Sequence, residues 1–251
     1  MTIKNYHKEI DIAIMAAKEA GKVLLEEKEN LNVLNISNQR DTKLKADLVS
    51  ENLIKDIIKS NSNYSILAEE SGKSSENMGE IFWVIDPLDG TANYNRNIPI
   101  CCISIGMVSN MKPIFGVIYD FNNNDMYVGN KNTGLSTLNK SKINVSDIKV
   151  KSEGVLLTGL PVDSDYSDTS LKKTIDDMRS WKKTRMIGSA AMASCYVASG
   201  KAEMYKENGA YLWDIIAGAA IVESAGGSVL ISNISETFQV DVIFSNLNIK
   251  D

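Results

Sequence analysis

The fold of this chain is decided by the stretch Phe82-Trp83-Val84-Ile85-Asp86-Pro87-Leu88-Asp89-Gly90-Thr91-Ala92-Asn93. An apolar run bounded by turn residues predicts a buried strand. This run stops abruptly at two carboxylates, a proline, a glycine and a threonine. Because binding and catalytic residues are often placed where a rigid element ends, we expect a core strand whose end forms one edge of an active site.

The two acids of this stretch are open to two interpretations. Asp86 and Asp89 are separated only by a Pro-Leu pair, and carboxylates held so close repel each other unless a cation lies between them. Hard divalent ions such as Mg²⁺ prefer oxygen ligands, and the Leu88 carbonyl in the same turn offers one more. The same residues also suit an ordinary Asp-Pro-x-Asp-Gly turn whose side chains bond to the backbone. Further acidic residues are needed to favour the metal site.

Acids elsewhere in the chain stand at the ends of predicted elements. Glu69 and Glu70 follow a short apolar run, Asp47 opens a predicted helix, and Asp214 precedes another. Each has a structural alternative, because Asp47 and Asp214 can be helix caps and the glutamates can be an exposed pair. Taken together, however, they gather at the kind of position where functional sites are built. Their joint presence favours a metal site.

The residues that follow Asp89 predict phosphate binding. Backbone N–H groups after a glycine turn bind phosphate oxygens if a helix begins there, so Gly90 and Thr91 are candidates. The sequence contains neither G-x-x-x-x-G-K-[ST] nor G-x-G-x-x-G, which disfavours P-loop and Rossmann nucleotide binding. The single histidine, His7, lies on a predicted surface helix, so a Ser-His-Asp or Cys-His mechanism is poorly supported.

Hydrophobic periodicity predicts alternating helices and strands along the whole chain. Helices are expected over 6–27, 47–60, 170–181, 192–198 and 214–225, and a polar turn over 39–43. Strands are expected over 31–36, 65–68, 81–85, 100–108, 114–119, 125–129, 154–158, 201–205 and 240–245. The central strands predict a mainly antiparallel meander, and the order of elements predicts stacked helix and sheet layers. We expect one domain over 1–251, with halves of about 1–145 and 146–251 joined where the composition turns polar.

Composition excludes several classes of protein. The chain has 251 residues, of which 43% are hydrophobic and 24% charged, as in an ordinary globular protein with a large core. Its net charge of −5 disfavours nonspecific binding to nucleic acid or to an anionic membrane. The amino terminus lacks the pattern of a signal peptide, and no apolar run approaches ~20 residues, so a cytoplasmic protein is expected. Cys101, Cys102 and Cys195 show no zinc or redox spacing and are expected to be buried.

Two motifs together carry a resemblance to a known family. Asp86-Pro87-Leu88-Asp89-Gly90-Thr91 with Asn93, and Leu212-Trp213-Asp214-Ile215-Ile216-Ala217-Gly218, closely resemble the two signatures of the inositol monophosphatase family. The likeness runs from the first helix to about Gly227 and includes the segments 68–72 and 188–191. The resemblance implies an α+β fold, layered α-β-α-β-α as in inositol monophosphatase and fructose-1,6-bisphosphatase. It also implies a homodimer and lithium-sensitive, Mg²⁺-dependent hydrolysis of phosphomonoesters.

The resemblance assigns roles to individual positions. The implied ligands of two or three Mg²⁺ ions are Glu69, Asp86, Asp89, Asp214 and the Leu88 carbonyl. The amides of Gly90 and Thr91 would hold the phosphate, while Asp47 and Thr91, with Glu69, would serve the attack of water on phosphorus. The implied contacts to the leaving group are Gly188, Ser189, Ala190 and Glu207.

The identity of the substrate stays open at this point. Around 160–163 the chain departs from the inositol-specific pattern, which leaves the choice of substrate open. The resemblance implies an inositol, polyol or sugar monophosphate as the substrate class. A 3′(2′),5′-bisphosphate nucleotidase and a fructose-1,6-bisphosphatase share the same signatures and remain alternatives. A catalytically silent binding protein of the same fold would be expected to lack at least one ligand, and none is missing.

Overall fold

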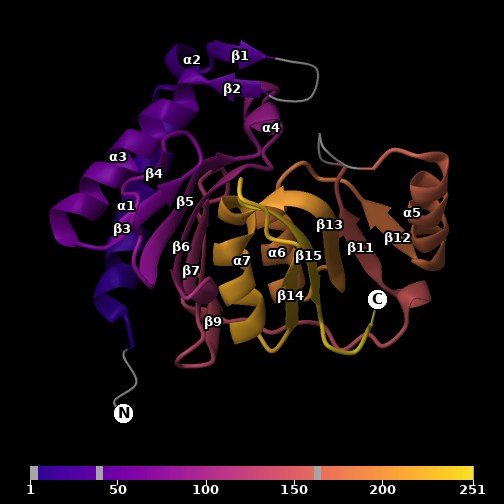
Figure 1. Cartoon of the computed structure of the whole chain (residues 1–251). Helices are drawn as coiled ribbons and strands as arrows, with labels where there is room; N and C mark the ends of the chain where they lie inside the picture. The colour runs from indigo at the N-terminus through magenta and orange to yellow at the C-terminus, as the bar shows by residue number, and fades with distance from the viewer. Residues whose placement is uncertain (1–4, 38–41, 161–164, 251) are drawn as a thin grey trace.

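The computed structural model describes residues 5–37, 42–160 and 165–250, which form stacked layers of helix and sheet (Figure 1). Two helices, α1 (His7–Glu26) and α3 (Lys45–Asn61), cover the outer face of an eight-stranded sheet. Between them in the chain lie α2 (Lys28–Leu31) and a small antiparallel pair, β1 (Leu34–Ser37) and β2 (Thr42–Leu44). The helices pack through one apolar face each, as their periodicity predicts.

The eight-stranded sheet has the order β10-β9-β8-β7-β6-β5-β3-β4. Its strands are β3 (Ser65–Ala68), β4 (Gly72–Lys73), β5 (Ile81–Asp89), β6 (Cys102–Ser109), β7 (Lys112–Asp120), β8 (Asp125–Asn130), β9 (Leu135–Leu138) and β10 (Ser141–Lys142). From β5 to β10 every neighbouring pair is antiparallel, which confirms the predicted meander. Only the pairing of β3 with β5 is parallel among the pairs described for this sheet.

Strand β5 lies between two hydrophobic cores. Trp83 and Ile85 point into the core beneath α1 and α3, whereas Phe82 and Val84 point into the core on the other face. Successive side chains of a strand alternate between its faces, so a strand that is buried on both sides must be apolar throughout. This explains the unbroken hydrophobic run that precedes Asp86.

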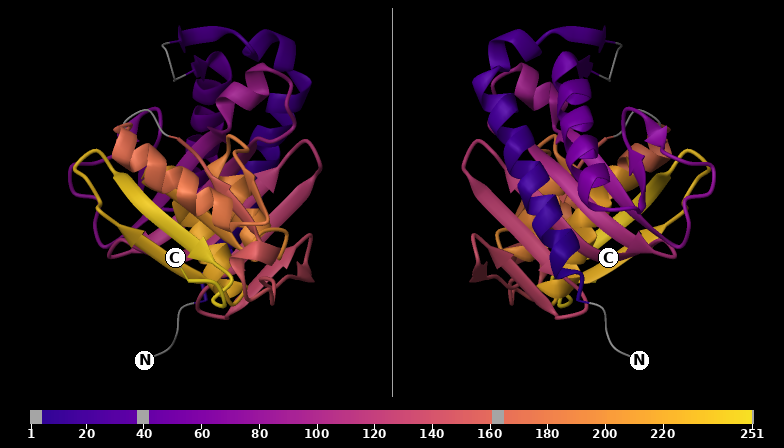
Figure 2. Two further views of the ribbon diagram at one scale, coloured as in Figure 1. Left: turned by 90° about the vertical axis from the view of Figure 1, so that its right-hand side faces the viewer. Right: turned by 90° about the vertical axis from the view of Figure 1, so that its left-hand side faces the viewer.

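The second core is shared with a five-stranded sheet of order β12-β11-β13-β15-β14. Its strands are β11 (Val155–Thr158), β12 (Lys183–Arg185), β13 (Met204–Tyr211), β14 (Ser228–Ser232) and β15 (Gln239–Ser245). Between the sheets lie α6 (Ala190–Ala198) and α7 (Leu212–Ser224), while α5 (Asp168–Ser180) covers the outer face of the smaller sheet (Figures 1 and 2). A short 3₁₀ turn, Lys151–Glu153, precedes β11. The resulting order of layers is α-β-α-β-α, as expected.

Helix α7 packs unusually close to the eight-stranded sheet at two glycines. A β-carbon on Gly116 would lie 2.0 Å from the Ala217 carbonyl oxygen, and one on Gly129 would lie 2.4 Å from Ile221 Cα. Both contacts are with helix backbone, which cannot turn aside as a side chain does. The absence of side chains at these two strand positions therefore sets the distance between α7 and the sheet.

Most predicted elements are confirmed, with some corrected bounds. The strand expected at 201–205 was misplaced, because β13 begins at Met204 and continues to Tyr211, so that Glu207 lies within a strand. The strand expected from 100 begins at Cys102, and that expected at 31–36 is displaced to Leu34–Ser37. Part of the predicted turn at 39–43 lies outside the described residues, whereas its last two residues belong to β2. The three cysteines are buried and free, and His7 is exposed on α1, as expected.

Candidate active site

The end of β5 forms the centre of the candidate site. Across the pairing with β6 the register shifts between Asp86 and Asp89, so the chain bulges where Pro87 and Leu88 lie. The Leu88 N–H donates to Asp86 Oδ1 at 2.9 Å, which closes a local turn. Both carboxylates are nevertheless almost fully buried. Asp86 and Asp89 therefore do belong to a turn with a side-chain bond to the backbone. That bond uses only part of the hydrogen-bonding capacity of the two acids.

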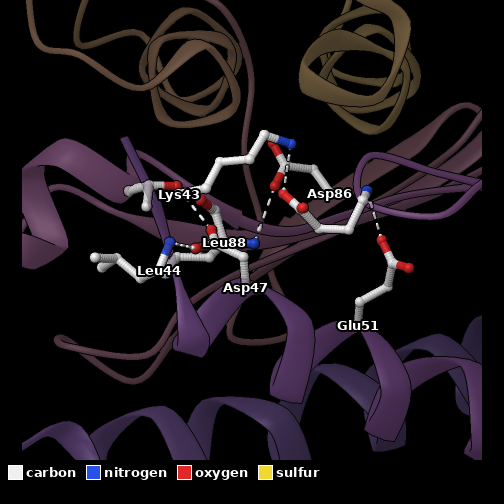
Figure 3. Close-up of polar contacts among 8 residues, drawn as sticks. Lys43, Leu44, Asp47, Glu51, Asp86 and Leu88 are labelled. Atoms are coloured by element: carbon white, nitrogen blue, oxygen red, sulfur yellow. Dashed lines mark hydrogen bonds and ion pairs between the residues drawn. The ribbon is translucent and has the colours of Figure 1, made fainter. Parts of the chain in front are cut away.

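Asp47 joins α3 to this turn, as Figure 3 shows. Its Oδ2 accepts the Leu44 N–H at 2.6 Å and thereby caps the helix, while its Oδ1 lies 2.9 Å from the Thr91 hydroxyl. That hydroxyl is also 3.0 Å from the Leu88 carbonyl oxygen. Burial raises the pKa of Asp47 to about 6, against the opposing effect of these hydrogen bonds. Asp47 thus caps the helix and also has a proton affinity suited to acid–base chemistry near neutral pH.

Two further segments, together with Asp89 of the same strand, bring carboxylates to Asp86. Glu69 follows β3, Asp89 ends β5, and Asp214 lies in the first turn of α7, where it caps the helix by accepting the Tyr211 N–H at 2.9 Å. Burial raises the pKa of Asp86 well above its usual range, and the negative charges of Glu69, Asp89 and Asp214 raise it further. The structure therefore gathers the acids that the sequence placed at separate element ends.

The pKa values of the remaining carboxylates of this group are also raised. Burial raises the pKa of Glu69 well above its usual range, and the charges of Asp214 and Glu70 add to this. Burial and then the charge of Asp89 do the same to the pKa of Asp214. Like charges in a buried site disfavour joint ionisation unless a cation compensates them. We call Glu69, Asp86, Asp89 and Asp214 the acidic cluster.

Asp89 differs from the other members because donors from the second half of the chain surround it. Its Oδ2 accepts hydrogen bonds from the Ser189 hydroxyl and from the Ala191 N–H at 2.8 Å, and the Cys102 thiol lies 3.8 Å away. The Ala190 N–H also favours the ionised form of Asp89, although burial raises its pKa overall. Ser189 and Ala190 were expected to contact the leaving group, whereas here their polar groups contact a carboxylate. Their role with substrate stays a prediction.

Gly90 and Thr91 meet the condition set for phosphate binding, since α4 (Thr91–Asn95) begins there. Gly90 has a φ of 87°, and a β-carbon on it would lie 2.8 Å from the Ile100 carbonyl oxygen, so only glycine fits. Asn93 of this helix donates to the carbonyl oxygens of Ile187 at 2.8 Å and Gly188 at 3.3 Å. The short helix is thereby tied to the segment that precedes α6.

Glu207 lies on β13, close enough to Asp89 for the charge of that carboxylate to raise its pKa. The Tyr205 hydroxyl donates to its Oε2 at 3.0 Å, and a β-carbon on Gly159 would lie 2.3 Å from the same oxygen. Burial raises the pKa of Glu207 to about 7, partly opposed by the Tyr205 hydrogen bond. Glu207 lines a cavity of about 490 Å³ between α5, β11 and the middle of β13. Residues 161–163, where the sequence departs from the inositol-specific pattern, lie outside the described residues.

The donor set fits a hard divalent cation, because it consists of carboxylate and carbonyl oxygens. The acids are close enough for their charges to raise one another's pKa. Yet in the part of the chain that the structure describes, no three His, Cys, Asp or Glu side chains are already arranged to hold an ion.

Comparison with known proteins agrees with this geometry. Residues 5–244 match the model of the inositol monophosphatase family. The chain belongs to the inositol monophosphatase family. A protein of Xylella fastidiosa named Nus factor SuhB is 36% identical over 224 residues, which cover 88% of this chain and 80% of that protein. Human inositol monophosphatase 1 is 32% identical over 231 residues, covering 88% of this chain and 82% of the enzyme.

Solved structures of this family confirm the fold. The structure of inositol monophosphatase from Anabaena (Nostoc) sp. PCC 7120 superposes with a TM-score of 0.84 at 34% identity, covering 97% of this chain and 92% of the other. This family member therefore has the layered α+β architecture that its two signatures predicted. Within the described residues, its helices do not combine the length and hydropathy needed to cross a membrane.

Proposed function

We propose that this chain is a Mg²⁺-dependent phosphatase that hydrolyses a small phosphomonoester, with inositol monophosphate or another polyol or sugar monophosphate as the substrate. The observation that carries the proposal is the acidic cluster, whose members raise one another's pKa beside the Asp47–Thr91 hydrogen bond. Such a group of buried acids is costly unless a cation binds there. Its position next to a glycine turn that opens a helix supports a phosphate ester as the ligand.

The proposed division of roles follows the geometry. The acidic cluster and the Leu88 carbonyl would hold two or three Mg²⁺ ions, which when bound neutralise negative charge on the phosphate and on the leaving oxygen. The Gly90 and Thr91 amides would bind phosphate oxygens. The Thr91 hydroxyl donates a hydrogen bond to Asp47, so its oxygen is free to accept a hydrogen bond from the attacking water. As the water attacks, its proton passes to the Thr91 oxygen while the Thr91 proton passes to Asp47. Glu69 would orient the same water.

Substrate recognition is proposed for residues from the second half of the chain. Glu207 and the 188–190 segment would contact hydroxyls of the leaving alcohol. A carboxyl whose pKa lies at about 7 can accept or donate a hydrogen bond near neutral pH, which suits a polyol. The same geometry leaves 3′(2′),5′-bisphosphate nucleotidase and fructose-1,6-bisphosphatase activity as alternatives within this reaction class.

A panel of phosphomonoesters tests the proposal. We expect phosphate release that requires Mg²⁺ and is inhibited by Li⁺, and kcat/KM compared side by side for inositol 1-phosphate, adenosine 3′,5′-bisphosphate and fructose 1,6-bisphosphate identifies the substrate class. Asp47→Asn keeps the size of the side chain and an acceptor oxygen but cannot take up the proton, so its kcat should fall about 100-fold or more. Absence of Mg²⁺-dependent release from every ester would refute the proposed activity.

The relatives named Nus factor SuhB provide the reason to test a non-enzymatic role. A catalytically silent binding protein would bind ligand without turnover, which the same assay detects. We retain the phosphatase as the proposal because every expected ligand is present and gathered at one place. By the same resemblance we infer a homodimer, which light scattering of the purified chain would test.

A further inference from the structure

The turn after β3 presents Glu69, and it is short. Glu69, Glu70 and Ser71 connect β3 to β4, a strand that pairs with β3 through only two residue pairs. On one side the turn is tied to the core sheet, because the Glu69 N–H donates to the Ile85 carbonyl oxygen at 3.2 Å. The position of the Glu69 carboxylate therefore depends on what holds the other side of the turn.

That other side is held by Glu51 of α3, a carboxylate that the proposed chemistry does not use. Glu51 is only 2% exposed, and its Oε2 accepts the Glu70 N–H at 2.7 Å. A buried carboxylate that accepts a backbone N–H forms a strong charge-assisted hydrogen bond, provided that its charge is balanced. Figure 3 shows Glu51 reaching from the helix toward the segment that lies beside Asp86.

Lys55 balances this charge and contacts the same turn. Its Nζ lies 3.2 Å from Glu51 Oε1, one helical turn away, and donates to the Ser71 hydroxyl at 2.9 Å. From the opposite element, β2, Lys43 forms an ion pair with Glu70 Oε1 at 2.9 Å. The backbone and side chains that flank Glu69 are thus held by charged groups on two separate elements.

Helix α3 also carries Asp47, one turn before Glu51. Residues four apart lie on the same face of a helix, so Asp47 and Glu51 both face the site. Asp47 contacts Thr91 on the phosphate side, whereas Glu51 contacts the turn that bears Glu69. One rigid helix therefore fixes the proposed proton acceptor and the proposed metal ligand relative to each other.

We propose that Glu51 and Lys55 form a clamp that positions Glu69 for divalent-cation binding. The inference rests on the proposed function, because it assigns a purpose to residues around the proposed ligand. Both are positioning residues, since they act through the backbone and the hydroxyl of the turn. Without the clamp, the turn is held by Ile85 and Lys43 alone among the contacts described above, and the Glu69 carboxylate samples a wider range of positions.

Calorimetric titration of Mg²⁺ into the chelator-treated full chain measures this effect without relying on turnover. Glu51→Gln removes the charge at constant shape, and Lys55→Met removes the ammonium while keeping the length of the side chain. Loss of residues that orient metal ligands typically weakens binding 10–100-fold, so we expect Mg²⁺ affinity to fall about tenfold or more in each variant. Asp56→Asn and Lys59→Met, exposed on the same helix, are matched controls that should leave it unchanged.

A purely structural role is distinguished by two more measurements. It would lower the unfolding temperature in the absence of Mg²⁺ without altering the affinity of the folded protein, whereas the clamp predicts reduced affinity and its recovery in Lys55→Arg. If Glu51→Gln does not fold, the half-buried Lys55→Met decides the question. Wild-type affinity in both charge-removed variants overturns the clamp. A wild-type chain that takes up no Mg²⁺ overturns the proposed function instead.

Discussion

The end of β5 and the cavity beside β13 both bury carboxylates, but they balance them differently. At the end of β5, acids from separate segments raise one another's pKa, and Asp86 has no cation as its partner in the contacts described. On β13, Glu207 accepts a hydrogen bond from the Tyr205 hydroxyl, burial is the main cause of its raised pKa, and the charge of Asp89 adds only the last of the contributions. The first arrangement calls for an added cation, whereas the second needs only a proton or a hydroxyl group.

This difference separates two tasks within one fold. Repulsion within the acidic cluster lowers the stability of the fold when no ion is present. Ion binding relieves this repulsion, which makes binding more favourable. A single carboxyl that is neutral near pH 7 can exchange hydrogen bonds with an alcohol without a large change in charge. Substitutions that break one region should therefore respond to Mg²⁺, and substitutions in the other should respond to pH.

The largest effect is expected from Asp86→Asn, which removes the charge at the centre of the acidic cluster. Mg²⁺ binding and Mg²⁺-dependent turnover should fall more than about 100-fold, beyond the loss typical of residues that only orient a ligand. In chelator the variant should be more stable than wild type, because a buried repulsion is gone. Thermal unfolding with and without Mg²⁺ measures both effects, with Asp56→Asn, exposed on α3, as the control. Equal stabilisation by Mg²⁺ in Asp86→Asn and wild type would contradict the comparison.

Two glycines differ in what surrounds them: Gly116 packs against a helix backbone and Gly159 against a side chain. Gly116→Ala places a methyl group against the backbone of α7, so the helix that carries Asp214 must move. We expect a loss of about 3 kcal/mol or more in the free energy of unfolding, at the upper end for overpacked cores. Gly159→Ala meets only the end of the Glu207 side chain, which can rotate away, and should cost clearly less. Urea unfolding of both variants gives the comparison, and similar costs would show that α7 adjusts freely.

The next largest effect concerns pH in the second region. The pKa of Glu207 in the fold, about 7, lies above its ordinary value of 4.5, so folding favours the neutral form. Its favourable contribution is complete below pH 4.5 and is lost as pH rises through 7. Glu207→Gln should therefore leave stability unchanged near pH 4 and raise it at pH 8, by up to about 3 kcal/mol. Denaturant titrations at both pH values test this, and an equal gain at each would exclude the raised pKa as the cause.

The sequence predicted the first region better than the second. The apolar run before Asp86 is buried on both faces of β5, which makes it strongly patterned, and the acids stand directly at element ends. In the second half, β12 and β14 were missed because Lys183–Arg185 is short and polar and Ser228–Ser232 is only partly buried. Such strands are defined by their partners rather than by their own pattern.

Within the site, contacts between residues far apart in the sequence were not predicted. Glu51 stands four residues after Asp47, which places it on the same helix face, but nothing local shows that it meets the Glu70 N–H. Likewise, the donors from 189–191 to Asp89 join residues a hundred positions apart. Spacing identifies which residues share an element, whereas contacts between elements depend on the packing of the whole chain. Resemblance to the family supplied the proposed ligand set but did not supply these contacts.

The last prediction tests whether Ser189, from the second half of the chain, tunes the acidic cluster. Ser189 and Ser167 both cap helices, accepting the Met192 N–H at 3.2 Å and the Ser170 N–H at 3.3 Å. Replacing either by alanine should cost about 1 kcal/mol through the lost cap. The Ser167 hydroxyl also donates to the exposed Asp165 at 3.1 Å. Ser189 instead donates to the buried Asp89, where a hydrogen bond to the ionised group is worth roughly 1.5–3 kcal/mol. Ser189→Ala should therefore also weaken Mg²⁺ binding, whereas Ser167→Ala should not.

The physical reason is that a ligand must be deprotonated to bind the ion. The Ser189 hydroxyl lowers the pKa of Asp89, so its removal leaves that carboxyl harder to ionise, and Mg²⁺ must then displace a proton more often. The loss of affinity in Ser189→Ala should consequently be larger at pH 6 than at pH 8. A loss independent of pH would mean that Ser189 acts by placing Asp89 alone, and no loss would mean that the second half of the chain does not tune the acidic cluster.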